Sequence, residues 1–169
     1  MIDNRQLTPH FSLFEMTTTE LSQFQYENRT LTGDLVKAIT ATATLLEIVR
    51  EIVNCPLIVL SGYRCADLNK AVGSGNASQH LLGQAADVSP SGRDIFLVFE
   101  ELWKAVKEGK LYLGQLILET AQRDHPENTW IHVSLGIPWR PGEKDNQILR
   151  MLNGVYTILE GEPLDLIDA

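Results

Sequence analysis

The chain has 169 residues, of which 44% are hydrophobic and 21% charged, and its formal net charge is −8. These values are ordinary for a soluble globular protein, so we expect residues 1–169 to form a single domain. No stretch approaches the roughly 20 apolar residues of a membrane-spanning helix. The 14 Lys and Arg residues are scattered, so we expect no nucleic-acid partner, because phosphate binding needs clustered basic side chains.

The amino-terminal segment 1–15 has neither a basic region nor an apolar stretch, so no secretory signal is predicted. We therefore expect the protein to be made in the cytoplasm, with Cys55 and Cys65 reduced. A disulfide between them would also require the chain to double back, because a predicted strand lies between the two cysteines. The sequence does not indicate the oligomeric state.

The first part of the chain is predicted to be helical. Ser12 and Glu15 have the spacing of a capping box, which predicts a short first helix. A longer helix is predicted from about Asp34 to Val53, because its apolar residues recur at helical spacing. Asn54 then ends this helix.

Short strands and one further helix are predicted after it. The apolar run Leu57–Leu60 is typical of a buried strand, and Ser91 is predicted to cap a helix that Gly109 ends. Asn153-Gly154, between two apolar segments, predicts a hairpin. The other predicted strands are Ala85–Ser89, Gln115–Thr120 and Trp130–Ser134. Helices followed by short strands predict an α+β fold, with a short antiparallel sheet packed with helices.

Three of the predicted strands have one apolar face and one face with polar or ionisable groups. Side chains alternate across a strand, so Asp87, Glu119 and His132 each lie opposite an apolar face. If the three strands belong to one sheet, these side chains line a common surface. The Gly- and Ser-rich loop 73–78 can bring His80 over the same surface.

His80, Asp87 and His132 together make a set of two imidazoles and one carboxylate. A catalytic zinc site typically has three such ligands and keeps its fourth position for water, whose pKa the ion lowers. Since the set contains no cysteine, a closed structural zinc site is disfavoured. Each residue alone would be ordinary in a strand or turn, so their common pattern is what indicates a site.

That pattern is characteristic of a family. Residues 78–87 match Ser-x-His-x-x-Gly-x-Ala-x-Asp at all five fixed positions. Together with the segments below, this motif resembles the zinc D-alanyl-D-alanine carboxypeptidase and endopeptidase family of peptidoglycan peptidases, within the superfamily of lysostaphin-like enzymes and the hedgehog domain. The resemblance spans about residues 10–135 and leaves 136–169 as a tail with a predicted hairpin. The supporting segments are Phe11-Ser12-Leu13-Phe14-Glu15-Met16, Ser61-Gly62-Tyr63-Arg64 and Trp130-Ile131-His132-Val133-Ser134.

The resemblance implies that His80, Asp87 and His132 bind one zinc ion. It also implies that Arg64 holds the substrate or stabilises the charge that develops on the attacked carbonyl. A permanently protonated guanidinium with several donors suits that role. The residues expected to bind substrate, or to hydrogen-bond behind the ligands, are Ser78 and Trp130.

The general base departs from the family pattern. Many relatives have an acidic residue three positions before the last histidine, where this chain has Thr129. Glu119 is the predicted replacement, because it lies on the polar face of the neighbouring strand. The other candidates lie in the loop before His132, namely Asp124, His125 and Glu127.

The predicted function is zinc-dependent hydrolysis of peptide bonds in peptidoglycan stem peptides or cross-bridges, by a carboxypeptidase or an endopeptidase. Without a secretory signal, the chain resembles phage-encoded lysis enzymes (endolysins) and virion-associated hydrolases. Such proteins reach the cell wall through a holin or within a particle. The alternatives are a catalytically inactive, zinc-containing module that binds the cell wall and a structural protein of a phage particle.

Overall fold

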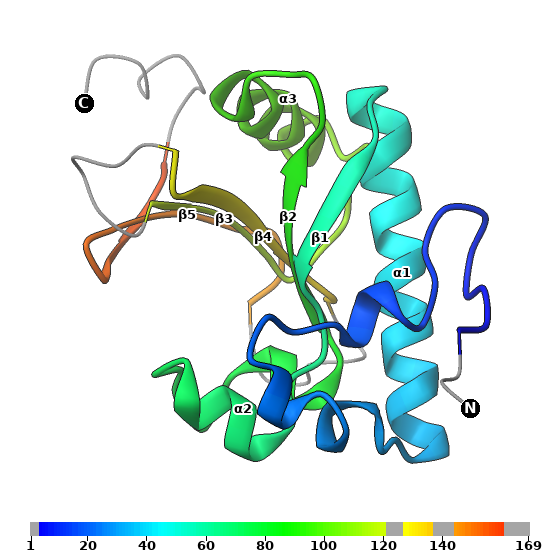
Figure 1. The fold of residues 1–169 in the computed structure, drawn as a ribbon. Coiled ribbons are helices and arrows are strands. Elements are labelled where there is room, and N and C mark those ends of the chain that lie inside the picture. The colour runs from blue at the N-terminus through cyan, green and yellow to red at the C-terminus, as the bar shows by residue number, and fades with distance from the viewer. Residues whose placement is uncertain (1–3, 121–126, 137–143, 161–169) are drawn as a thin grey trace.

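The computed structural model describes residues 4–120, 127–136 and 144–160 (Figure 1). Within them, six strands form one mixed sheet in the order β1-β2-β4-β3-β5-β6. The strands are β1 (Leu57–Ser61), β2 (Ala85–Pro90), β3 (Gln115–Thr120), β4 (Thr129–Ser134), β5 (Gln147–Leu152) and β6 (Val155–Ile158). The helices are α1 (Gly33–Val53), α2 (Ala66–Ala71) and α3 (Ile95–Lys107), with single 3-10 turns η1 (Glu15–Thr17), η2 (Ser22–Phe24), η3 (Glu27–Arg29) and η4 (Gln79–Leu82). The predicted α+β fold is confirmed.

The sheet was predicted to be antiparallel but is mixed, because β3 and β5 pair in parallel, whereas the other four pairings are antiparallel. Since β4 runs opposite to β3, it ends beside the start of β3. A strand that begins there, on the far side of β3, must run parallel to β3. The predicted hairpin at Asn153-Gly154 is confirmed as β5–β6, and it extends the same sheet.

The helices α1 and α3 cover one face of this sheet (Figure 1). Strand alternation turns Val88, Leu118 and Ile131 toward these helices, and each of the three is fully buried. Their partners are apolar side chains of the two helices, such as Leu46 and Phe99. The opposite face of the sheet carries the polar side chains of the candidate site. Among the described residues, no helix is long and apolar enough to span a membrane.

The strand β1 is an edge strand and not a buried one. Its apolar run predicted burial on both faces, but Ile58 is 53% exposed and Leu60 is 50% exposed. The reason is topological, because in the described part of the chain β1 pairs only with β2 and forms one edge of the sheet. An apolar run cannot by itself distinguish a central strand from an edge strand.

The predicted caps are partly confirmed. Ser12 and Glu15 form a reciprocal capping box, in which the Ser12 amide donates to the Glu15 carboxylate and the Glu15 amide donates to Ser12 Oγ. The prediction of Ser91 as a cap was wrong. Asp94 caps α3, because its carboxylate accepts from the amides of Phe96 and Leu97.

The amino-terminal segment holds the loop that follows β1. The buried side chain of Asn28 donates to the carbonyl of Tyr63 and accepts from the amide of Cys65 at 2.7 Å. The amide of Tyr63 donates to the carbonyl of Met16 at 2.8 Å. Gly62 directly precedes Tyr63, and a Cβ atom at Gly62 would overlap the Met16 carbonyl oxygen.

We therefore expect Gly62→Ala to destabilise the fold by about 2–4 kcal/mol, because a backbone oxygen and not a flexible side chain obstructs the new methyl group. The matched control is Gly75→Ala, since a Cβ atom at Gly75 meets nothing within 4 Å. This control should stay within about 0.5 kcal/mol of the parent. Urea unfolding measures both changes, and equal stabilities would show that the loop moves freely away from Met16.

Candidate active site

The three predicted metal ligands come from two strands and one turn. Asp87 and His132 are register partners on the adjacent strands β2 and β4, and both face away from the helices. His80 lies in η4, which ends at Gly83 with a φ of 66°. The hydroxyl of Thr42 in α1 donates to the Gly83 carbonyl at 2.8 Å and so fixes this turn to the helix.

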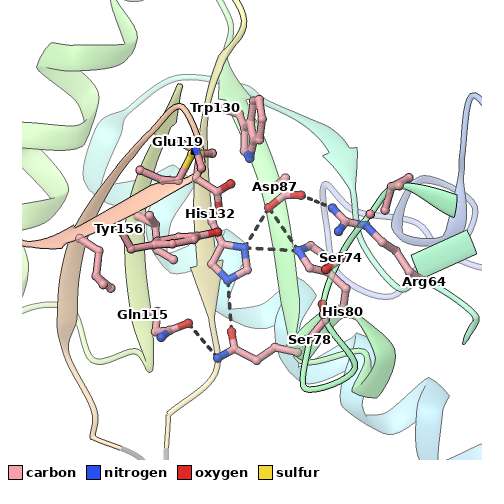
Figure 2. A pocket seen from close by; sticks show the side chains of 18 of the residues that line it. Arg64, Ser74, Ser78, His80, Asp87, Gln115, Glu119, Trp130, His132 and Tyr156 are labelled. Carbon is pink, nitrogen blue, oxygen red and sulfur yellow. Dashed lines mark hydrogen bonds and ion pairs between the residues drawn. The ribbon is translucent and has the colours of Figure 1, made fainter. Parts of the chain in front are cut away.

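The ligand atoms of His80, Asp87 and His132 all lie within 4.8 Å of one another, and the three residues are buried. His80 Nε2 is 3.3 Å from His132 Nδ1 and 3.2 Å from Asp87 Oδ1, and His132 Nδ1 is 2.9 Å from Asp87 Oδ1 (Figure 2). Ligands about 2.0–2.1 Å from a tetrahedral zinc ion are separated by about 3.3 Å. The three atoms therefore have the spacing of a zinc-ligand set.

The neighbours of the two imidazoles determine which nitrogen carries the proton. His80 Nδ1 lies 2.6 Å from the carbonyl oxygen of Gly62, and His132 Nε2 lies 3.1 Å from the amide oxygen of Gln79. Because both oxygens can only accept, these two nitrogens must donate. The other nitrogens, His80 Nε2 and His132 Nδ1, then direct lone pairs toward Asp87. Two lone pairs and a carboxylate oxygen meeting in a buried place fit a divalent cation.

Arg64 holds the second carboxylate oxygen of Asp87. Its guanidinium donates to Asp87 Oδ2 and, through Nε, to Ser61 Oγ at 2.7 Å. Burial alone would raise the pKa of Asp87, but the adjacent His80 and His132 outweigh burial and hold that pKa well below the usual range. Arg64 also lines the cavity described below, so it touches the substrate space as well as a ligand.

Glu119 lies on the same sheet face as the ligands. It pairs with Trp130 across β3 and β4 and lines the cavity beside His132 (Figure 2). Burial raises the pKa of Glu119, and the negative charge of Asp87 adds to the rise, while His132 and Arg64 oppose it. A half-buried carboxyl group with a raised pKa beside a metal site is suited to proton transfer.

Neither Thr129, which has the family's usual base position, nor the candidate Glu127 is brought to the proposed ligands. Thr129 is buried, and its hydroxyl bonds to that of Thr120 at 3.0 Å. Glu127 is exposed and is not part of the cavity wall. Asp124 and His125 lie outside the described residues.

The site opens into a cavity of about 890 Å³. Ser78 and Trp130, the residues predicted to bind substrate or support the ligands, both line it. The indole Nε1 of Trp130 is buried and makes no hydrogen bond to the described residues. A bound molecule with a carbonyl oxygen could therefore satisfy this donor.

Part of the cavity wall was not predicted from the sequence. Leu149 and Met151 of β5 and Tyr156 of β6 line the cavity, and Tyr156 lies on the side opposite Arg64 (Figure 2). Burial raises the pKa of Tyr156, and the charges of Glu119 and Asp87 raise it further, so its phenol remains a hydrogen-bond donor. The hairpin was predicted, but its position beside β3 depends on the parallel pairing, for which the sequence has no signal.

Comparison with known proteins agrees with this geometry. The family model described as peptidase M15 matches residues 10–134, which contain all three ligands, Glu119 and Arg64. A search of curated proteins finds no match to the chain. With about three quarters of its length matched by the family model and the His-Asp-His cluster in place, the chain belongs to the peptidase M15 family of zinc-dependent metallopeptidases.

Proposed function

We propose that this protein hydrolyses peptide bonds in peptidoglycan stem peptides or cross-bridges, with one zinc ion held by His80, Asp87 and His132. The observation that carries the proposal is the convergence of two imidazole lone pairs and one carboxylate oxygen beside Glu119 in an open cavity. The family supplies the reaction class, since M15 members are peptidases. The substrate class rests on the resemblance of the motifs to peptidoglycan peptidases.

Glu119 is the proposed general base. When bound, a zinc ion lowers the pKa of water and polarises the carbonyl group that is attacked. Glu119 accepts the proton of the attacking water and later delivers it to the nitrogen of the leaving amine. Its raised pKa favours the delivery step, because a more basic carboxylate holds the proton until the amine departs.

Trp130 and Tyr156 are the proposed hydrogen-bond donors to the substrate, and Arg64 is proposed to act through its charge. Arg64 orients Asp87 through its bond to Oδ2, and it adds positive charge at the cavity wall where the carbonyl oxygen becomes negative. Trp130 Nε1 and the Tyr156 hydroxyl are neutral donors on the other sides of the same space. Ser78, at the start of η4, is a further hydroxyl that a peptide can contact.

The charges of the cavity favour cleavage of an internal bond over removal of a carboxyl-terminal residue. A carboxypeptidase binds the terminal carboxylate, typically with a cationic group. Among the described residues that line the cavity, the only Lys or Arg is Arg64, and its guanidinium is already bound to Asp87. We therefore propose endopeptidase action, at the cell wall, by a phage-encoded lysis enzyme or virion-associated hydrolase.

The proposed ligands predict the metal content of variants. Purified protein should contain about one zinc ion per chain, and His80→Ala or His132→Ala should lose most of it, because each removes one of only three protein ligands. The matched control is His10→Ala, which removes an exposed histidine bound to Glu47. Elemental analysis measures the zinc, and full retention in both ligand variants would refute the assignment.

The role of Glu119 predicts a loss of turnover without a loss of metal. Glu119→Gln should lower kcat by at least roughly 100-fold, as loss of a general acid–base group does, and should leave zinc content unchanged. Glu51→Gln, which removes an exposed carboxylate of α1, is the control and should keep normal kcat. If Glu119→Gln turned over at the parent rate, Glu119 would not be the base.

In the metal-free protein, the stability difference between Glu119→Gln and the parent should depend on pH. Burial raises the pKa of Glu119 in the folded state, so the folded protein holds this proton more tightly than the unfolded chain. The ionised carboxylate therefore destabilises the fold above the ordinary glutamate pKa, and fully above the raised one. Glu119→Gln should be more stable than the parent at neutral pH, and the gain should vanish as pH falls below the ordinary pKa. Urea unfolding across this pH range measures the difference.

The substrate proposal is tested with defined muropeptides and mass spectrometry of the products. We expect cleavage at an internal bond, with similar rates for substrates that have a free or an amidated carboxyl terminus. Strong preference for the free terminus would identify a carboxypeptidase instead. A protein that binds zinc but releases no product from any muropeptide would be the inactive binding module or structural protein.

A further inference from the structure

Three side-chain amides connect the ligand His132 to the carboxyl-terminal hairpin. Gln79 Oε1 lies 3.1 Å from His132 Nε2, and Gln79 Nε2 donates to Gln115 Oε1 at 2.8 Å. Gln115 Nε2 in turn donates to Gln147 Oε1 at 2.9 Å. The three glutamines come from η4, β3 and β5, and the bond that reaches Gln115 is drawn in Figure 2.

The direction of these bonds is the same throughout. All three amides accept through oxygen from the His132 side, and Gln79 and Gln115 donate through nitrogen toward the next amide. If Gln79 alone rotated by half a turn, its nitrogen would face His132 and its oxygen would face the oxygen of Gln115. Two such oxygens repel, so reversal of one amide requires reversal of the next.

His132 needs this support more than His80 does. The proton on His80 is fixed by the carbonyl of Gly62, a backbone group that cannot rotate by itself. The proton on His132 is fixed by the side-chain amide of Gln79, and a side-chain amide can rotate. His132 Nδ1 also lies 2.9 Å from Asp87, so a proton on that nitrogen would find an attractive partner and would block the lone pair.

We propose that Gln79, Gln115 and Gln147 form an amide relay that keeps the proton of His132 on Nε2 and so leaves Nδ1 available to a metal ion. The inference rests on the proposed zinc site and assigns these glutamines a positioning role. Gln79 occupies a variable position of the Ser-x-His motif, and Gln147 lies beyond the residues that the family model matches. The relay thus ties a metal ligand of the family core to a strand outside it.

Gln84 provides a matched control. It occupies another variable position of the same motif and is 9% exposed, the same fraction as Gln79. Its side-chain oxygen has no hydrogen-bond partner among the described residues, and it does not line the cavity. Gln79→Leu and Gln84→Leu therefore make the same chemical change at equally buried positions, and only the first removes a contact to His132.

The experiment measures zinc dissociation constants by competition with a chromophoric chelator. Gln79→Leu should weaken zinc binding by about 10- to 100-fold, the range for loss of a group that orients a metal-binding histidine. Gln147→Leu should weaken it less, by roughly 2- to 5-fold, because the nearer two amides remain. Gln79→Glu, which keeps an oxygen toward His132 Nε2, should bind at least as tightly as the parent. Gln84→Leu should not change the affinity.

A second measurement reports the proton itself. In the zinc-loaded protein, proton NMR should show two slowly exchanging imidazole N–H signals, from His80 toward Gly62 and from His132 toward Gln79. Gln79→Leu should lose only the second, and the first serves as an internal control for the fold. If the fold of Gln79→Leu is lost, Gln79→Glu and Gln147→Leu still test the relay.

The outcomes separate the relay from the metal site. A parent protein that takes up no zinc would refute the zinc site and the relay together. If the parent binds zinc and Gln79→Leu binds it equally well with both N–H signals intact, the relay alone is refuted. The relay is supported if Gln79→Leu weakens binding, Gln147→Leu weakens it less and Gln84→Leu does not change it. Parent-like affinity and N–H signals in Gln147→Leu would refute the relay beyond Gln79.

Discussion

Two imidazole nitrogens and a carboxylate oxygen face one another on this sheet. Each imidazole carries its proton on its other nitrogen, which points away from the carboxylate. The carbonyl of Gly62 and the amide oxygen of Gln79 impose that arrangement on His80 and His132. Three buried polar groups at such short separations are not a main source of folding free energy, because burial opposes their charges. That free energy comes from the opposite sheet face, where α1 and α3 bury the apolar side chains.

Strand alternation lets one sheet face stabilise the fold while the other carries the site. Every second residue of β2, β3 and β4 faces the helices, and the others face the cavity. The cavity face places two carboxylates in different surroundings. Asp87 has two imidazoles and Arg64 against it, and its pKa is lowered despite burial. Glu119 lies on β3, two residues beyond the register partner of His132, and burial is the main cause of its raised pKa. A pair of carboxyl groups whose pKa values are shifted in opposite directions suits one ligand and one proton carrier.

The sequence predicts those parts of the fold and the site that depend on local residue patterns. The bounds of β3 and the polar face shared by Asp87, Glu119 and His132 follow from alternation, and the spacing of the motif indicates the ligand set. What the sequence could not supply depends on contacts between distant segments. The parallel position of β5 and the exposure of β1 are set by the order of strands in the sheet. The cap of α3 was misplaced because Ser91 and Asp94 are both good capping residues, and only the path of the chain decides between them.

The boundary of the family match divides the site into two parts. Residues 10–134 end with the last residue of β4, so they include every proposed metal ligand and the proposed base. The hairpin β5–β6 lies beyond that boundary, yet Leu149, Met151 and Tyr156 form a wall of the same cavity. We infer that the matched residues supply the chemistry and the hairpin adapts the cleft to its peptide. Because Gln147 belongs to the same hairpin, a change there that alters the substrate wall is also transmitted, through Gln115 and Gln79, to a metal ligand. The proposed relay would then couple substrate selection to affinity at the proposed metal site through these three hydrogen bonds.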